Sequence, residues 1–127
     1  MDTIRKATYF KKEIIIVEFH DRKEAEMIEL LFALESFIKS ENKKVLLLHI
    51  FNDKSYITSA FLRQAEKLTQ EIDHLIEKRT MTGYNRVKKM ILNGYNLLLR
   101  KNIQAFDTLD EAIIFLTDDN TTDKLVK

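Results

Sequence analysis

Residues 44–51 (KVLLLHIF) form a nearly continuous apolar run, and this run most limits the folds open to the chain. Apolar side chains on both sides of a strand are typical of the centre of a sheet that helices cover on both faces. The run is far shorter than the ~18 to 20 apolar residues that cross a bilayer, and no other stretch of the chain reaches that length. We therefore predict a central, doubly covered strand and no membrane span.

Segments rich in strand-forming residues alternate with segments of helical periodicity along the rest of the chain. Residues 4–10 and 13–20 predict a hairpin turning at Lys11-Lys12, and Asp21 with Glu24 resembles a capping box that starts a helix ending near Ser40. After the central strand, the patterns predict a helix over 58–78, a weak strand over 79–82, a helix over 85–100, a strand over 103–106 and a last helix from Asp107-Thr108.

The predicted order is ββαβαβαβα, which indicates an α/β fold. Strands that alternate with helices form parallel sheets through right-handed crossovers, so we expect a mixed, mostly parallel five-stranded sheet. The 127 residues contain no proline and two glycines, so no linker composition divides the chain. We predict one domain over residues 1–127, with a frayed polar tail over 118–127.

The composition narrows the classes of function. The chain has no cysteine, which excludes disulfides, zinc–thiolate sites and a cysteine nucleophile, and its amino-terminal apolar run is too short for a secretion signal. We therefore predict a cytoplasmic protein. The formal net charge is +1, so the lysines and arginines between residues 77 and 101 are interpreted as a solvated helix face, and nucleic acid is an unlikely partner.

Residues 82–116 carry a family resemblance. The matching positions are Thr82, Gly83, Val87, Lys88, Lys89, Ile91, Leu92, Phe106, Asp107, Thr108, Asp110, Glu111 and Ala112. In this pattern the segment resembles the C-terminal half of a bacterial STAS-like (SpoIIAA-like) family, and the element order is the one that STAS-like domains share. The resemblance implies the fold of the anti-sigma-factor antagonists, although most of this family has no assigned biochemical role.

The resemblance also points to the start of the helix at 58–78. In the antagonists a phosphorylated serine lies at this position, and the nearest counterpart here is Thr58-Ser59-Ala60, which makes Ser59 and Thr58 candidate regulatory residues. A phosphate at a helix N-terminus meets unpaired N–H groups and a favourable dipole. The alternative is that one of the two hydroxyls simply caps the helix.

A second candidate region lies at the carboxyl ends of the parallel strands, where open α/β sheets tend to bind ligands. Gly83 would let a backbone approach a small anion there, although a lone glycine before a helix is more often part of a turn, and the chain has no glycine-rich phosphate-binding motif. The candidate ligand or partner residues are Asn52, Asp53, Ser55, Thr82, Gly83, Tyr84, Asn85, Lys88 and Lys89.

Motifs for catalysis and metal binding are missing from the sequence. His20, His49 and His74 share no metal-binding spacing, and His49 falls in the buried strand, which favours a core histidine over a ligand or base. No set of nucleophile, base and orienting residue can be assembled. We therefore predict no metal, no cofactor and no enzymatic activity.

These observations favour a non-catalytic STAS-like module that binds a protein partner. Apolar positions cover more than one side of the helix at 21–40, which suggests a homodimer through that helix. The alternative function is binding of a small molecule or lipid, either at the strand-end loops or in an apolar cavity. The residues expected to line such a cavity are Leu48, Ile50, Phe61, Ile91 and Tyr95.

Overall fold

A five-stranded mixed sheet is the centre of the computed structural model, which describes residues 3–19, 23–52, 55, 58–83 and 104–118. The strands lie side by side in sequence order, the first pair antiparallel and the other pairs parallel. They are β1 (Ile4–Tyr9), β2 (Lys12–Glu18), β3 (Val45–Ile50), β4 (Ile76–Thr82) and β5 (Gln104–Phe106). The predicted α/β class and mixed five-stranded sheet are confirmed.

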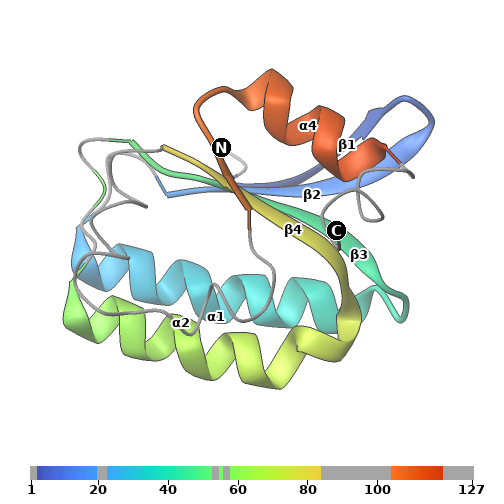
Figure 1. Ribbon diagram of the computed structural model, residues 1–127. Helices are drawn as coiled ribbons and strands as arrows, with labels where there is room; N and C mark the ends of the chain where they lie inside the picture. Colours follow the sequence, from blue (N-terminus) through green and yellow to red (C-terminus); the bar gives the residue numbers. More distant parts are fainter. Residues whose placement is uncertain (1–2, 20–22, 53–54, 56–57, 84–103, 119–127) are drawn as a thin grey trace.

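Helices cover both faces of this sheet (Figure 1). Helix α1 (Glu24–Ser40) and helix α2 (Ser59–Ile72) pack side by side on one face, and α4 (Leu109–Thr117) lies on the other. Because β2, β3 and β4 follow one another in a single direction, right-handed crossovers place α1 and α2 on the same face.

The alternation of side chains along the strands divides the interior into two apolar cores. On β3, Leu47 and Phe51 beyond it face α1 and α2, whereas Leu46 and Leu48 face α4. Both sets are buried, which explains why residues 44–51 have almost no polar position.

Helix α1 begins later than its sequence pattern predicts. Its first residue is Glu24, and the Glu26 side chain accepts a hydrogen bond of 3.1 Å from the backbone N–H of Lys23, which is the residue at the N-cap. The prediction that Asp21 is the N-cap, with Glu24 three positions later, is therefore wrong. The same capping pattern, an N-cap with a glutamate three positions later, occurs two residues further along at Lys23 and Glu26. The sequence alone does not show which of the two positions starts the helix.

Helix α2 ends at Ile72, six residues before the predicted end at 78, and the chain passes through a 3₁₀ turn (Asp73–Leu75) into β4. Leu75 and Ile76 pack against the same core as the helix. Because both residues are apolar and continue the helical spacing of apolar positions, the sequence predicts a longer helix. In the structure Leu75 lies in the 3₁₀ turn and Ile76 begins β4. As a result β4 has seven residues, and the predicted strand over 79–82 covers only its second half.

The remaining boundaries are close to the predicted ones. The hairpin forms, but its turn is Phe10-Lys11 rather than Lys11-Lys12, because Tyr9 pairs with Lys12. Strand β5 falls within the predicted 103–106, and α4 starts at Leu109 after Thr108 at the N-cap. The predicted helix over 85–100 and most of the predicted tail lie outside the described residues. No helix in the described part of the chain is long and apolar enough to cross a membrane.

Gly83 ends β4 at a point where the chain crowds β3. Its φ is +92°, and a Cβ built there would lie 2.5 Å from the carbonyl oxygen of Phe51. That oxygen is backbone, so it cannot move aside as the end of a flexible side chain would. The glycine is therefore required by the packing of the strand ends.

We predict that Gly83→Ala lowers the free energy of unfolding by about 2 kcal/mol or more, because it adds both the clash and an unfavourable φ. Urea denaturation of the two chains measures the difference. Asn42→Gly is the matched control, because Asn42 also has a positive φ of 57° and glycine relieves that conformation. An alanine variant as stable as the parent would contradict the crowding.

Candidate functional site

Hydrogen bonds among residues that follow the strands connect the strands at the carboxyl edge of the sheet. The Ser55 hydroxyl is buried, donates a hydrogen bond of 3.0 Å to the carbonyl of Phe19 and accepts one of 3.0 Å from the backbone N–H of Asn52. The backbone N–H of Phe51 donates to the carbonyl of Thr82 at 3.2 Å. These bonds link the ends of β2, β3 and β4.

The structure therefore brings four of the predicted loop residues together: Asn52, Ser55, Thr82 and Gly83. Their hydrogen bonds and close packing serve the fold, which favours the turn interpretation of this edge. The strand order also runs in one direction from β2 to β5, so these strands have no switch point of the kind where doubly wound sheets bind ligands. The other predicted loop residues lie outside the described residues: Asp53, Tyr84, Asn85, Lys88 and Lys89.

The two candidate regulatory hydroxyls occupy different positions at the start of α2. Thr58 is the N-cap, and its Oγ1 accepts a hydrogen bond of 3.2 Å from the backbone N–H of Phe61. Ser59 is the first helical residue and is exposed. Thr58 therefore has a structural task, whereas modification of Ser59 stays a prediction.

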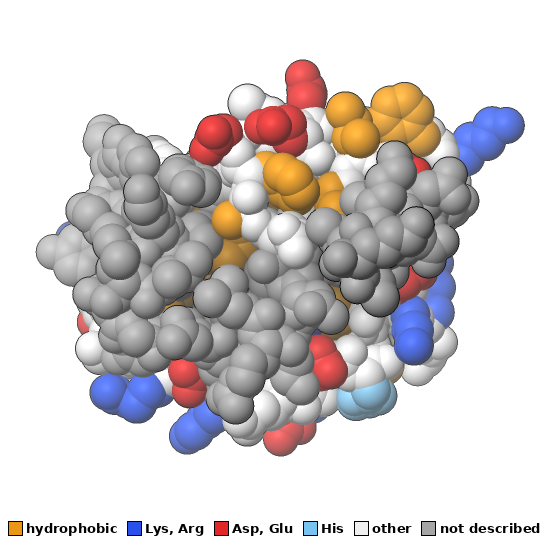
Figure 2. Space-filling model, viewed as in Figure 1, with side chains coloured by type: hydrophobic (Ala, Val, Ile, Leu, Met, Phe, Trp, Pro, Cys, Tyr) orange, Lys and Arg blue, Asp and Glu red, His pale blue; other side chains and the backbone are white. Residues whose placement is uncertain are grey.

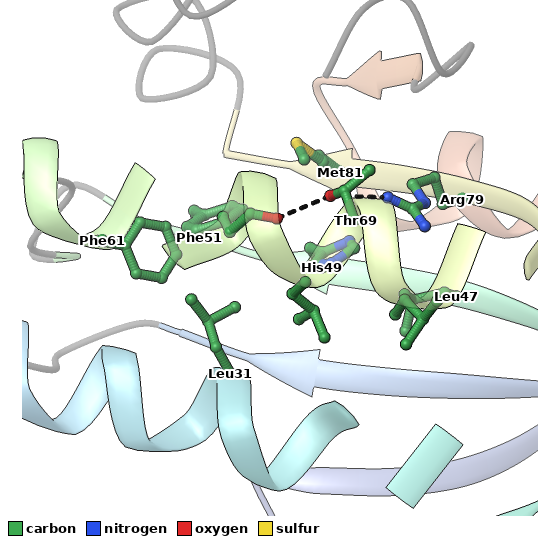
Figure 3. Close-up of a pocket in the computed structure, with 11 residues that line it drawn as sticks. Leu31, Leu47, His49, Phe51, Phe61, Thr69, Arg79 and Met81 are labelled. Carbon is green, nitrogen blue, oxygen red and sulfur yellow. Dashed lines mark hydrogen bonds between the residues drawn. The ribbon is translucent and has the colours of Figure 1, made fainter. Parts of the chain in front are cut away.

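A polar cluster that the sequence patterns did not reveal lies between the sheet and helices α1 and α2 (Figure 3). It borders a small cavity of about 30 Å³. The polar side chains in its wall are those of His49, Thr69 and Arg79. The other lining residues are apolar: Leu31, Leu47, Phe51, Phe61, Ala65, Leu68, Ile72 and Met81.

Arg79 is the charged member of this cluster, and only 5% of its surface is exposed. Its Nη1 donates a hydrogen bond of 3.2 Å to Oγ1 of Thr69, whose own hydroxyl donates one of 2.8 Å to the carbonyl of Ala65. Its Nη2 is buried and has no hydrogen-bond partner in the part of the chain that the structure describes. Burial lowers the pKa of Arg79, and the nearby Asp73 carboxylate raises it by a smaller amount.

His49 lies beside Arg79 in an aromatic stack. Its ring is nearly parallel to those of Phe19 and Phe51, with centroids 6.1 and 6.4 Å away. Its Nδ1 lies 3.3 Å from the carbonyl oxygen of Thr80, which assigns the ring proton to Nδ1 because a carbonyl only accepts. Burial, and then the charge of Arg79, lower the pKa of His49 from 6.5 to about 3. The imidazole is therefore neutral, as expected for a core histidine.

This cluster does not resemble a catalytic site. Thr69 uses its hydroxyl proton within α2, and no carboxylate of the described residues is seen to orient His49. The described residues also contain no group of three or more histidines and carboxylates placed to hold a metal ion. Chemically, the cluster offers one fixed cationic donor at the wall of a small, mostly apolar space.

The apolar cavity predicted for a lipid or small molecule is not formed as expected. Leu48 and Ile50 belong to the core under α4, whereas Phe61 belongs to the core on the other face of the sheet, so the three cannot line one space. Ile91 and Tyr95 lie outside the described residues. The cavity beside Arg79 is far smaller than the roughly 300 to 1,000 Å³ of typical ligand pockets.

Exposed apolar side chains gather elsewhere, on the hairpin and on α4. Phe10, at the tip of the hairpin, is 73% exposed, and Ile114 and Leu109 on α4 are 55% and 40% exposed. Figure 2 shows hydrophobic side chains on the α4 side of the molecule and lysine or arginine side chains at the hairpin end. On α1, the exposed apolar residues are Phe32, Ala25 and Ala33, which form a narrower surface than the sequence pattern suggests.

No family model, curated protein or solved structure matches this chain. The comparisons therefore leave the STAS-like resemblance of residues 82–116 as it stood, neither supported nor contradicted.

We predict that His49 makes the stability of the chain depend on pH. Its pKa is about 3 in the folded chain and 6.5 ordinarily, so between these values the unfolded chain binds a proton that the folded chain does not. Stability should therefore fall as the pH falls through this window, by up to about 1.4 kcal/mol per pH unit from this residue. His49→Phe preserves the stack and should lose this part of the slope.

Urea denaturation between pH 4.5 and 7 measures how the free energy of unfolding changes with pH for the parent and for His49→Phe. Both chains contain the same carboxylates, so the contribution of the carboxylates cancels in the difference between the two slopes. His74→Phe is the matched control for the replacement of a histidine by phenylalanine, because His74 is exposed. Equal slopes for the parent and the His49 variant would show that His49 titrates normally.

Proposed function

We propose that this chain is a non-catalytic docking module that binds a protein partner through the hairpin tip and the outer side of α4. The proposal rests on one observation, the exposed Phe10 in a left-handed turn. It agrees with the expectation of a non-catalytic module that the STAS-like resemblance and the missing catalytic motifs favour, and it includes the cytoplasmic location expected from the absence of cysteine and of a secretion signal in the sequence.

Phe10 lowers the stability of the turn that it occupies. Phe10 and Lys11 are the two central residues of the hairpin and have φ of 50° and 68°. Positive φ at both positions favours Asn-Gly, because side chains with a bulky Cβ substituent are strained there. Phe10 is 73% exposed as a residue, so its side chain gains little from packing in the fold. An exposed, strained aromatic residue is a reasonable anchor for a partner.

The surroundings of Phe10 extend this surface. Lys78 donates through its Nζ to the carbonyls of Phe115 and Asp118, at 3.1 and 2.7 Å, which fixes the end of α4 over the amino half of β4. The hairpin turn precedes β2 and so lies at the same end of the sheet, beside the C-terminal part of α4 (Figure 1). Ile114 therefore lies at the same end of the molecule as Phe10.

The charges near this end favour an acidic partner. Lys11 and Lys12 follow Phe10, and a groove of about 250 Å³ at the amino ends of the strands is lined by three lysines, Lys12, Lys43 and Lys44, and by two carboxylates, Glu13 and Glu77. Lys43 is partly compensated by Glu13, at 3.5 Å. We therefore expect a partner that receives the Phe10 ring in an apolar pocket with carboxylates at its rim.

Homodimerisation through α1 remains a separate expectation. Phe32 is 51% exposed, but its apolar neighbours on the outer side are only alanines. Light scattering of the purified chain, with Phe32→Ser as the comparison, measures this directly.

We predict that the double variant Phe10→Asn/Lys11→Gly stabilises the chain by about 1 kcal/mol while it weakens partner binding, because Asn-Gly fits the turn. Urea denaturation measures the first effect. A variant less stable than the parent would mean that Phe10 contributes to the fold, and would remove the reason for assigning it to a partner.

We also predict that a photoreactive phenylalanine analogue at position 10, in the native cell, forms a defined cross-linked product. The same analogue at exposed Lys67 on α2 is the control for surface position. Adding Ile114→Ser should reduce the product from position 10 at least severalfold if α4 shares the interface. The same products from positions 10 and 67, or none from position 10, would contradict the docking surface.

A further inference from the structure

We propose that the cavity beside Arg79 is a binding site for a small monovalent anion, of the size of chloride or formate. This site is separate from the docking surface and does not depend on the proposed function.

The first argument is the unsatisfied donor. Nη2 of Arg79 is buried and has no hydrogen-bond partner among the described residues, and leaving a buried charged donor without a partner is costly. The guanidinium cannot simply turn to find one, because Nη1 is held by Thr69, and Thr69 in turn is fixed by its bond to the carbonyl of Ala65 (Figure 3). Arg79 is one of the residues that line the cavity, and its guanidinium is held there by the bond to Thr69.

The second argument is charge. Among the residues that line the cavity, Arg79 is the only one with a formal charge, since His49 is neutral. Asp73 favours the charged form of Arg79, but burial has the larger and opposite effect on its pKa. No carboxylate of the described residues lines the cavity, so its wall offers a positive charge to an external anion.

The third argument is size. A cavity of about 30 Å³ holds roughly two water molecules, since one needs at least about 10 to 15 Å³. This excludes phosphate esters, nucleotides and fatty acids. Leu31, Phe61 and Leu68 contribute apolar wall, which favours a singly charged, weakly hydrated anion over sulfate or phosphate, whose desolvation is far more costly.

Another unpartnered polar atom belongs to the opposite side of the sheet. Thr80 Oγ1 is buried and finds no hydrogen-bond partner within the described ranges. Thr80 pairs with Leu48, which faces α4, whereas Arg79 and Met81 face the cavity. Thr80 is therefore not part of the anion site.

The test is thermal unfolding of the full chain at constant ionic strength, with sodium gluconate, which is too large to enter, replaced stepwise by sodium chloride or sodium formate. A ligand that binds only the folded chain raises the midpoint, by about 3 to 6 °C when its concentration is ten times its dissociation constant. Arg63→Met is the matched control, because Arg63 is an exposed arginine on α2, and it should keep this dependence. Arg79→Met should lose it, whatever its own midpoint.

Diffraction from crystals of the unaltered chain grown in sodium bromide gives a second result that needs no variant. We expect an anomalous peak within hydrogen-bonding distance of Arg79 Nη2, and this result decides the question if Arg79→Met does not fold. The proposal is overturned if gluconate and chloride give the same midpoint, if Arg79→Met folds and keeps the chloride dependence, or if the cavity contains water alone in bromide.

Discussion

The position of β3 between two parallel neighbours is the constraint on which the rest of the structure depends. Its backbone pairs with β2 on one side and β4 on the other, and its side chains are buried towards α1 and α2 on one face and towards α4 on the other. Burial on both faces removes nearly every polar position from the strand. The polar exception, His49, is neutral and bonded to the carbonyl of Thr80, so it meets the same requirement.

This arrangement also determines where function can be sought. Hydrogen bonds of Ser55 and Phe51 and the close approach of Gly83 connect the carboxyl ends of the parallel strands, so the described residues at that edge are engaged in structural contacts. The opposite end of the sheet has the hairpin tip, where Phe10 is exposed in an unfavourable conformation. Strain and exposure at one end, and satisfied packing at the other, are the physical reasons for assigning docking to the hairpin end.

The second candidate feature arises because β4 brings an arginine under the helices. Arg79 and Met81 alternate with Thr80 and Thr82, so the odd-numbered positions face α1 and α2. A guanidinium in that position needs partners from a neighbouring element, and Thr69 of α2 supplies one. Arg79 was part of a weak, polar strand in the sequence, and the signal that it was buried is visible only once β4 is known to start at Ile76.

The sequence by itself determined the α/β class, the mixed five-stranded sheet, the hairpin and the helices α1, α2 and α4, because apolar periodicity reports which faces are buried. It misplaced the start of α1 and the end of α2, because neighbouring caps and a continuing apolar stripe satisfy the same local rules. It proposed the residues at the carboxyl edge but could not show that they bond to one another. Only the tertiary structure decided that Leu48 and Phe61 lie on opposite faces, that Arg79 meets Thr69, and that Phe10 is left exposed. Such facts depend on contacts between residues far apart in the chain, and local patterns contain no information about which of those contacts form.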